Sequence, residues 1–310
     1  MRSEAAATGV QRLRTPFAAA PLDRRRVALV GVLLALAAVA WLVTGDRMSG
    51  MDAGPNTDPG TLGFYVGTWV VMMAAMMFPS ISPMVSVYAR LNTGRRESGR
   101  SAPVGATVAF VAGYILTWTV AGLVGFAIVK IARSLSIDAL SWDSAGPYVA
   151  GGVIVAAAVY QLTPLKDVCL THCRGPLTFL IRHWRDGRLG ALRMGVVHGG
   201  WCVGCCWALM AALFALGVMS LTWMVLIAAL IALEKMLPWK RVANVGVAAC
   251  LVALGLAVAF VPGHVPGLTE PDSAQARGSM MKMNDGGTMP PAKMKGGDAM
   301  PPAKDQMEKR

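Results

Sequence analysis

A histidine and three cysteines lie close together in one apolar stretch of the chain. The stretch HGGWCVGCCWALM, residues 198–210, contains His198, Cys202, Cys205 and Cys206. On an α-helix all four side chains fall within an arc of about 100°. Imidazole nitrogen and thiolate sulfur are ligands that suit Cu(I), with Zn(II) as the next choice. The pattern predicts a soft-metal site on one face of a helix.

The length of this face limits how many of the four groups one ion can bind. His198 and Cys206 are separated by about 12 Å along a helix axis, whereas metal–ligand bonds measure about 2.0–2.3 Å. The workable sets on this helix are the three cysteines together, or His198 with Cys202. The remaining ligands then come from another helix, or the face carries two successive sites.

A second cluster of ligand-type residues lies in YQLTPLKDVCLTHCRGP, residues 160–176. Thr163-Pro164 is typical of a helix start and Gly175-Pro176 of a helix end. We therefore expect the residues between them to form a short helix at the inner membrane surface. One side of this piece presents Cys169, His172 and Cys173, which we include among the candidate metal ligands.

Methionines form a third group of soft ligands, in TWVVMMAAMMFPSISPM, residues 68–84. Met73 and Met77 are four residues apart and share a helix side, and Met76 follows Met72 at the same spacing. We take Met73, Met76 and Met77 as candidate thioether ligands. The alternative is that these flexible side chains only fill space beside the kink that Pro79 introduces.

Glu234, in LIALEKMLPWKR, is the acidic candidate. It could orient the His198 imidazole, bind the metal directly, or pair with Lys235 or Lys240 at the membrane surface. Cys250 stands alone in an apolar run, so we expect it to be a packing residue. Packing is also the alternative for the clustered cysteines, although ionisable groups inside a membrane usually serve a function.

The elements that position these groups are predicted to be transmembrane helices. Of the 310 residues, 55% are hydrophobic and 15% are charged, and the apolar residues gather in blocks of about twenty, long enough to cross a bilayer. The fold class is therefore all-α, a polytopic membrane bundle of about seven helices. The expected spans are 27–44, 62–88, 103–131, 147–163, 194–219, 221–237 and 242–262.

The distribution of charge predicts the orientation of the chain. With alternate loops on opposite sides, about two thirds of the 29 lysines and arginines fall on the side of the N-terminus, which makes that side cytoplasmic. We expect a multi-pass protein of a bacterial inner membrane, with the C-terminus outside. The net charge of +12 is thereby explained without a nucleic-acid partner.

The two ends of the chain have the composition of disordered segments. Residues 1–26 form a basic lead, residues 27–262 the transmembrane domain, and residues 263–310 a tail rich in Met, Gly, Pro and Lys. Thioethers are neutral ligands for Cu(I), so the tail could collect the ion with low affinity. Its methionines are Met280, Met281, Met283, Met289, Met294, Met300 and Met307.

The motifs, taken in order, resemble a bacterial family called predicted metal-binding integral membrane proteins, the domain of unknown function 2182. The resemblance covers about residues 60–262 and excludes the Met-rich tail. It rests on MMAAMMFPS, YQLTPLKDVCLTHCR, HWRDG, GVVHGGWCVGCCWALM and EKMLP. Trp239-Lys240 follows EKMLP where we expect glycine, a small departure.

The resemblance implies an integral membrane fold and metal binding. Its residue pattern carries over to Cys169, Cys173, His198, Cys202, Cys205, Cys206 and Glu234. Because metal binding is itself inferred for that family, the resemblance supports the fold and the ligands more than a mechanism.

Three classes of function compete for these residues. The leading hypothesis is a membrane-embedded protein that binds copper as Cu(I), or Zn(II) as the alternative, for transport, delivery or metalloprotein assembly. Its expected partners are membrane lipid, the metal ion, and a metalloprotein client or metallochaperone. The second is a membrane thiol–disulfide oxidoreductase that uses Cys202 and Cys205, and a third is a scaffold whose cysteines only pack. No nucleotide-binding motif and no catalytic triad is present in the sequence, so we do not predict an enzyme.

Overall fold

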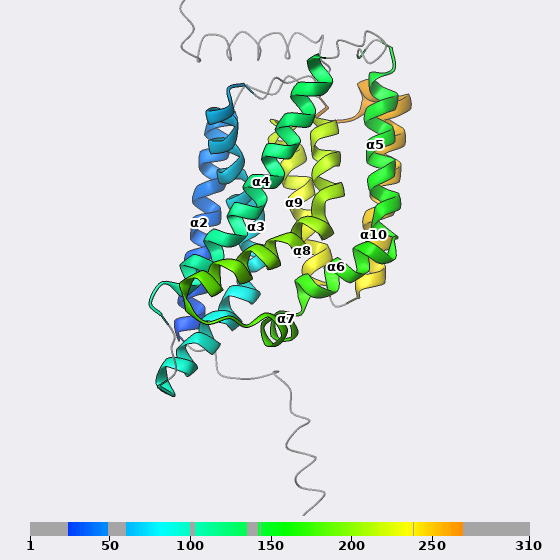
Figure 1. Ribbon diagram of the computed structural model, residues 1–310. Helices are drawn as coiled ribbons and strands as arrows, with labels where there is room; N and C mark the ends of the chain where they lie inside the picture. The colour runs from blue at the N-terminus through cyan, green and yellow to red at the C-terminus, as the bar shows by residue number, and fades with distance from the viewer. Residues whose placement is uncertain are drawn as a thin grey trace, which may run out of the picture.

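The computed structural model describes residues 24–48, 60–99, 103–134, 142, 144–237 and 239–268. Throughout these residues the secondary structure is helical (Figure 1). The helices are α2 (Arg24–Met48), α3 (Leu62–Glu97), α4 (Ala106–Ser134), α5 (Gly146–Gln161), α6 (Pro164–Arg174), α7 (Pro176–His183), α8 (Gly187–Leu216), α9 (Leu221–Met236), α10 (Lys240–Phe260) and the 3-10 turn η3 (Pro262–His264). The predicted all-α fold is confirmed.

Each of the seven predicted spans corresponds to a helix, but the helices differ in length. Five are long and apolar enough to cross a membrane, namely α2, α3, α4, α8 and α10. α5 joins them if it forms one broken span with α6, to which it is bent by 68°. α9 has 16 residues, fewer than the roughly 20 that a bilayer requires.

Large apolar side chains on the outside of the bundle suit a lipid environment. Leu42 on α2 is 74% exposed, and Val108 and Ile128 on α4 are 72% and 62% exposed. Exposed apolar surface that continues along a helix is unfavourable in water and favourable against acyl chains. The chain therefore has the surface of an integral membrane protein.

Small residues let α8 approach its neighbour α4 at backbone distance. A Cβ atom added to Gly113 would lie 2.1 Å from the Leu192 carbonyl oxygen, and one added to Gly195 would lie 2.0 Å from that of Phe110. Thr117 adds a hydrogen bond from its hydroxyl to the Val196 carbonyl at 3.2 Å. Close packing through glycine is typical of membrane helices. Here it holds α8, which carries HGGWCVGCCWALM, directly against α4.

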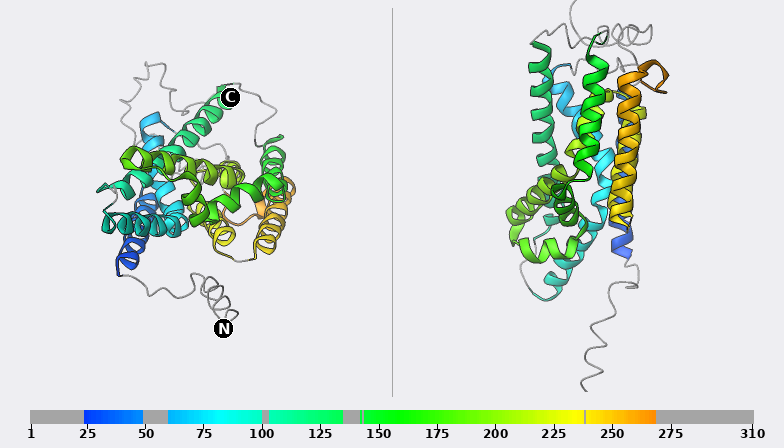
Figure 2. Two further views of the ribbon diagram at one scale, coloured as in Figure 1. Left: turned by 60° about the horizontal axis from the view of Figure 1, so that its bottom comes forward. Right: turned by 90° about the vertical axis from the view of Figure 1, so that its right-hand side faces the viewer.

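α6 is a short helix that lies across one end of the bundle, together with α7 (Figures 1 and 2). It begins as predicted, with the Thr163 hydroxyl accepting a hydrogen bond from the Lys166 backbone N–H at 3.3 Å, and it ends before Gly175. The guanidinium of Arg174 donates to the carbonyls of Glu234, at 3.1 Å, and Leu237. These bonds attach the end of α6 to the end of α9.

α3 passes through the bundle and carries the buried methionines as well as two internal prolines. Pro83 has no N–H to donate to the Pro79 carbonyl, and the Ser82 hydroxyl donates to that carbonyl instead, at 2.9 Å. The Ser80 hydroxyl likewise donates to the Met77 carbonyl at 2.9 Å. Ser82 therefore provides a donor for the carbonyl that Pro83 leaves without its helical N–H.

Some predictions lie outside the described residues. They concern nearly all of the 1–26 lead and the tail from residue 269 onward, including its seven candidate methionines. The cytoplasmic N-terminus and the outer C-terminus also stay predictions.

Candidate metal centre

The predicted ligand face of α8 points into the core of the bundle. His198 is 2% exposed, Cys202 0%, and Cys205 and Cys206 1% each. The helical spacing thus predicted correctly that these four side chains share one buried side. Because they are distributed along α8, the spacing does not determine which of these side chains lie within bonding distance of one ion.

Three thiols do meet, and one of them comes from a second helix. The Sγ atoms of Cys173, Cys202 and Cys205 all lie within 4.8 Å of one another. Cys173 is in the last turn of α6, whereas the other two are one turn apart on α8. A thiol of a second helix thus lies beside two thiols of α8, as expected if ligands are drawn from more than one helix. Sulfur atoms this close can bind one soft ion after small rotamer adjustments.

The other cysteines differ in their relation to this three-thiol cluster. Cys206 lies beside it, with its Sγ 3.3 Å from that of Cys205. Cys169 packs under α8, where a Cβ added to Gly204 would lie 2.9 Å from its Sγ. Cys250 is exposed on α10. The three thiols that lie within 4.8 Å of one another thus include Cys173 and not Cys206, and a ligand role for Cys206 stays a prediction.

A partly buried positive charge lies next to the cluster. The Lys235 ammonium group donates to Cys202 Sγ at 3.0 Å and to the Ser80 hydroxyl at 3.3 Å. The Tyr114 hydroxyl lies 3.1 Å from the same sulfur. A buried thiolate needs a compensating charge, and Lys235 supplies it. In the sequence, Lys235 was a candidate partner for Glu234 only, and no pattern indicated a role for Tyr114 or Ser80.

Glu234 has a different partner from those that the sequence suggested. Its carboxylate accepts a hydrogen bond from Lys166 at 2.6 Å, and the two side chains are 1% and 0% exposed. Lys166 also donates to the Cys205 carbonyl at 2.6 Å, whereas Lys240 donates to Thr171. Pairing of Glu234 with Lys235 or Lys240 is therefore wrong. The pair with Lys166 joins α6, α8 and α9 beside the cluster.

The two candidate histidines lie outside the three-thiol cluster. The ring of His198 is surrounded by Phe110, Tyr114 and Phe179, with centroid distances of 6.0, 5.9 and 5.1 Å. Its Nδ1 has no hydrogen-bond partner among the described residues. The ring of His172 stacks on Trp201 at 4.2 Å. The structure thus gives both imidazoles aromatic neighbours.

The candidate methionines of α3 are buried in the bundle. Met73 and Met77 are 0% exposed and Met76 is 3% exposed. Ser80, one turn after Met76 and Met77, touches Lys235. The methionines therefore approach the centre along α3, and a direct ligand role for them stays a prediction.

The chemistry of the cluster favours a soft metal ion as cargo. Thiolate sulfur selects Cu(I) over hard cations. Structural Zn(II) sites almost always use four ligands, and the cluster offers three sulfurs. Cys173 is partly exposed while Cys202 and Cys205 are buried. One thiol of the cluster is thus partly accessible, and the other two are enclosed by the bundle.

Comparison with known proteins agrees with this chemistry. A family model described as PpoB2, copper chaperone, matches residues 66–258. The matched region runs from α3 to α10 and contains every residue of the cluster together with Lys166, Glu234 and Lys235. No curated protein and no solved structure matches the chain. Since the family model covers more than half of the 310 residues, the chain belongs to the copper chaperone family PpoB2.

Proposed function

We propose that this protein is a membrane-embedded copper chaperone that holds Cu(I) on Cys173, Cys202 and Cys205 and passes it to a metalloprotein client. The observation that carries the proposal is the asymmetry of the cluster. Two thiols sit on the buried face of a long helix, and the third sits on a short helix at the end of the bundle. The motifs that resemble the metal-binding membrane family contribute these same three cysteines.

Transfer would proceed by exchange of ligands, with no change in the oxidation state of copper. A sulfur or nitrogen donor of the client forms a bond to Cu(I) as the bond to Cys173 Sγ breaks. The bonds to Cys205 and Cys202 then break in turn, and the freed thiolates regain protons or remain beside Lys235. Because exchange replaces one bond by another, the ion is never released bare.

The residues around the cluster would each support this exchange. Lys235 offsets the negative charge that two or three thiolates bring to a buried site. The Lys166–Glu234 pair and the bonds of Arg174 hold α6 against α8 and α9, which keeps Cys173 within reach of the other sulfurs. The three sulfur atoms are thereby held close together before the ion binds.

We further propose that the protein lies in a bacterial inner membrane with its N-terminus in the cytoplasm. The excess of lysine and arginine on the α6 and α7 side supports this orientation. The cluster would then lie toward the cytoplasmic face. That compartment keeps thiols reduced, as Cu(I) binding requires.

The ligand set can be tested by X-ray absorption at the copper edge on the full chain, reduced and loaded with Cu(I) in detergent. We expect a first shell of sulfur alone, which the Cys250→Ser control keeps. A first shell dominated by nitrogen or oxygen would contradict the proposal. A Cys202–Cys205 disulfide in rapidly quenched cells would favour the oxidoreductase hypothesis instead.

Delivery and transport can be separated in cells that lack the protein. A chaperone delivers copper to particular clients, so its loss should lower the copper content of those enzymes while total cell copper stays unchanged. A matching fall in total cell copper would favour transport over delivery.

A further inference from the structure

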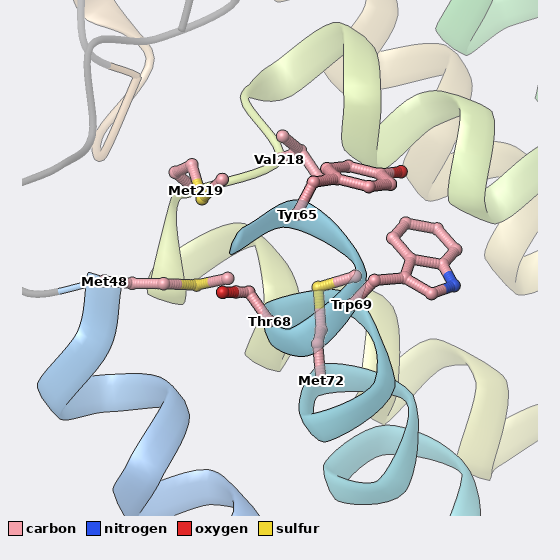
Figure 3. Close-up of a pocket in the computed structure, with 7 residues that line it drawn as sticks. All are labelled: Met48, Tyr65, Thr68, Trp69, Met72, Val218 and Met219. Carbon is pink, nitrogen blue, oxygen red and sulfur yellow. The ribbon is translucent and has the colours of Figure 1, made fainter. Parts of the chain in front are cut away.

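A small pocket lies where α2 ends and α3 begins (Figure 3). In Figure 1 this end of the bundle is opposite α6 and α7. It is lined by Met48, Tyr65, Thr68, Trp69, Met72, Val218 and Met219. The cavity volume is about 10 Å³, which is room for about one water-sized particle. The pocket is therefore sized for a single ion and not for an organic molecule.

Three thioethers reach this pocket from three separate elements (Figure 3). Met48 is the last residue of α2, Met72 is on α3, and Met219 is in the connection between α8 and α9. They are 5%, 1% and 3% exposed. Methionine makes up 20 of the 310 residues, so three methionines among seven lining residues is a strong enrichment. Thioether sulfur is a soft ligand that selects Cu(I).

The polar atoms around the pocket make a bound water a poor occupant. Trp69 donates its indole N–H to the Trp118 carbonyl at 2.8 Å, and the Tyr65 hydroxyl donates to the Gly122 carbonyl at 3.1 Å. Thr68 is 3% exposed, and its hydroxyl has no partner among the described residues. A buried water needs about two to four polar partners, and the side chains here offer one free hydroxyl.

We propose that Met48, Met72 and Met219 form a second site for a soft monovalent metal ion, Cu(I), with the Thr68 hydroxyl as an additional oxygen donor. Neutral thioethers leave the charge of the ion uncompensated, so this site binds more weakly than the thiol cluster. It needs no reduced thiol and so functions in an oxidising compartment. The site stands on the pocket alone and does not depend on copper binding at the cysteines.

The helix α3 connects the pocket to the cysteine cluster. Met72 and Ser80 are about 12 Å apart along a helix axis, and Ser80 contacts Lys235, which contacts Cys202. Between them α3 carries the buried Met73, Met76 and Met77. The weaker thioether site and the stronger thiol site are thus joined by further thioether sulfurs.

The site can be tested on the full chain after the other soft ligands are silenced. The background protein has all six cysteines changed to serine and the seven methionines of the tail changed to leucine. Cu(I) alone is titrated anaerobically against a competing chelator. We expect the background to bind Cu(I) weakly, and Met48→Leu, Met72→Leu and Met219→Leu each to lower that affinity at least tenfold.

Two matched controls separate loss of a ligand from loss of packing. Met84 and Met224 are 2% and 0% exposed and do not line the pocket, so Met84→Leu and Met224→Leu should leave the affinity unchanged. Equal affinities in pocket and control variants would overturn the proposal, as would a folded background protein that binds no Cu(I). Where a variant fails to fold, selenomethionine-labelled background protein should show copper–selenium scattering, and its absence would also overturn the proposal.

Failure of this test leaves the proposed function intact, because that function is tested with all cysteines present. Loss of Cu(I) binding at the cysteines would, in turn, leave the pocket result unchanged.

Discussion

The ammonium group of Lys235 lies 3.0 Å from the sulfur of Cys202, in a part of the bundle where that sulfur is fully buried. Lys235 follows Glu234 directly in the chain, yet the two side chains serve different partners. Glu234 pairs with Lys166, and Lys235 is left to face the thiols. A copper ion held by three thiolates carries a net negative charge, and this lysine reduces it.

Removal of the Lys235 charge should therefore weaken copper binding. We expect Lys235→Met, which keeps most of the side-chain volume, to lower Cu(I) affinity at least tenfold, about 1.4 kcal/mol. The measurement is a competition titration of the reduced full chain. Lys240→Met, on an exposed lysine that contacts Thr171, is the control. Equal affinities for the two variants would show that Lys235 does not stabilise the bound state.

The Lys166–Glu234 ion pair should contribute to the position of α6 more than to ligation. Replacement of one partner leaves a buried charge unpaired, which typically costs about 3–5 kcal/mol. Lys166→Met and Glu234→Gln should each lower the unfolding temperature in detergent and speed alkylation of Cys173. The double variant Lys166→Met/Glu234→Gln should recover much of the loss, because it leaves neither charge unpaired. Additive losses in the double variant would contradict a direct pair.

Close contact between α4 and α8 should make Gly195 intolerant of a side chain. A Cβ there would lie 2.0 Å from the Phe110 carbonyl oxygen, whereas one at Gly200 on the same helix would meet nothing within 4 Å. We expect Gly195→Ala to lower stability by about 1–3 kcal/mol or more, and Gly200→Ala to be neutral or slightly stabilising. Thermal unfolding of both variants in the same detergent decides this, and similar midpoints would argue against the packing described.

Orientation in the membrane is testable with a reporter fused after Arg310. The charge distribution predicts that this reporter is active on the outer side, which would place the thioether pocket near the outer face and α6 near the cytoplasm. Activity on the cytoplasmic side would mean that the predicted number of spans is off by one and that the tail does not lie outside. A fusion within residues 89–99, at the other end of α3, is the internal control and should report the cytoplasm.

Helical periodicity explains which parts of the centre were predictable. Residues four apart on one helix share a side whatever the tertiary structure, so the alignment of His198 with Cys202 was readable from spacing. Whether Cys169 or Cys173 meets that side depends on how α6 docks, which spacing within α6 does not determine. The three-thiol cluster therefore needed the structure.

The contacts that the sequence did not predict join segments that are far apart in the chain. Lys166 and Glu234 are 68 positions apart, and their pairing left Lys235 for Cys202. The thioether pocket combines the last residue of α2 with a residue of the α8–α9 connection, so no local pattern indicated it. His198, in contrast, was a candidate metal ligand by sequence, and in the structure its ring is surrounded by aromatic rings.

The most direct test of the account is the Cu(I) affinity of single cysteine-to-serine variants of the reduced full chain. Serine keeps the size of the side chain but is a poor ligand for a soft ion. Cys173→Ser, Cys202→Ser and Cys205→Ser should each lower the affinity at least tenfold, about 1.4 kcal/mol. Cys206→Ser should have a smaller effect, and Cys250→Ser should have none. Small and equal effects at all five positions would contradict a copper centre made by Cys173, Cys202 and Cys205.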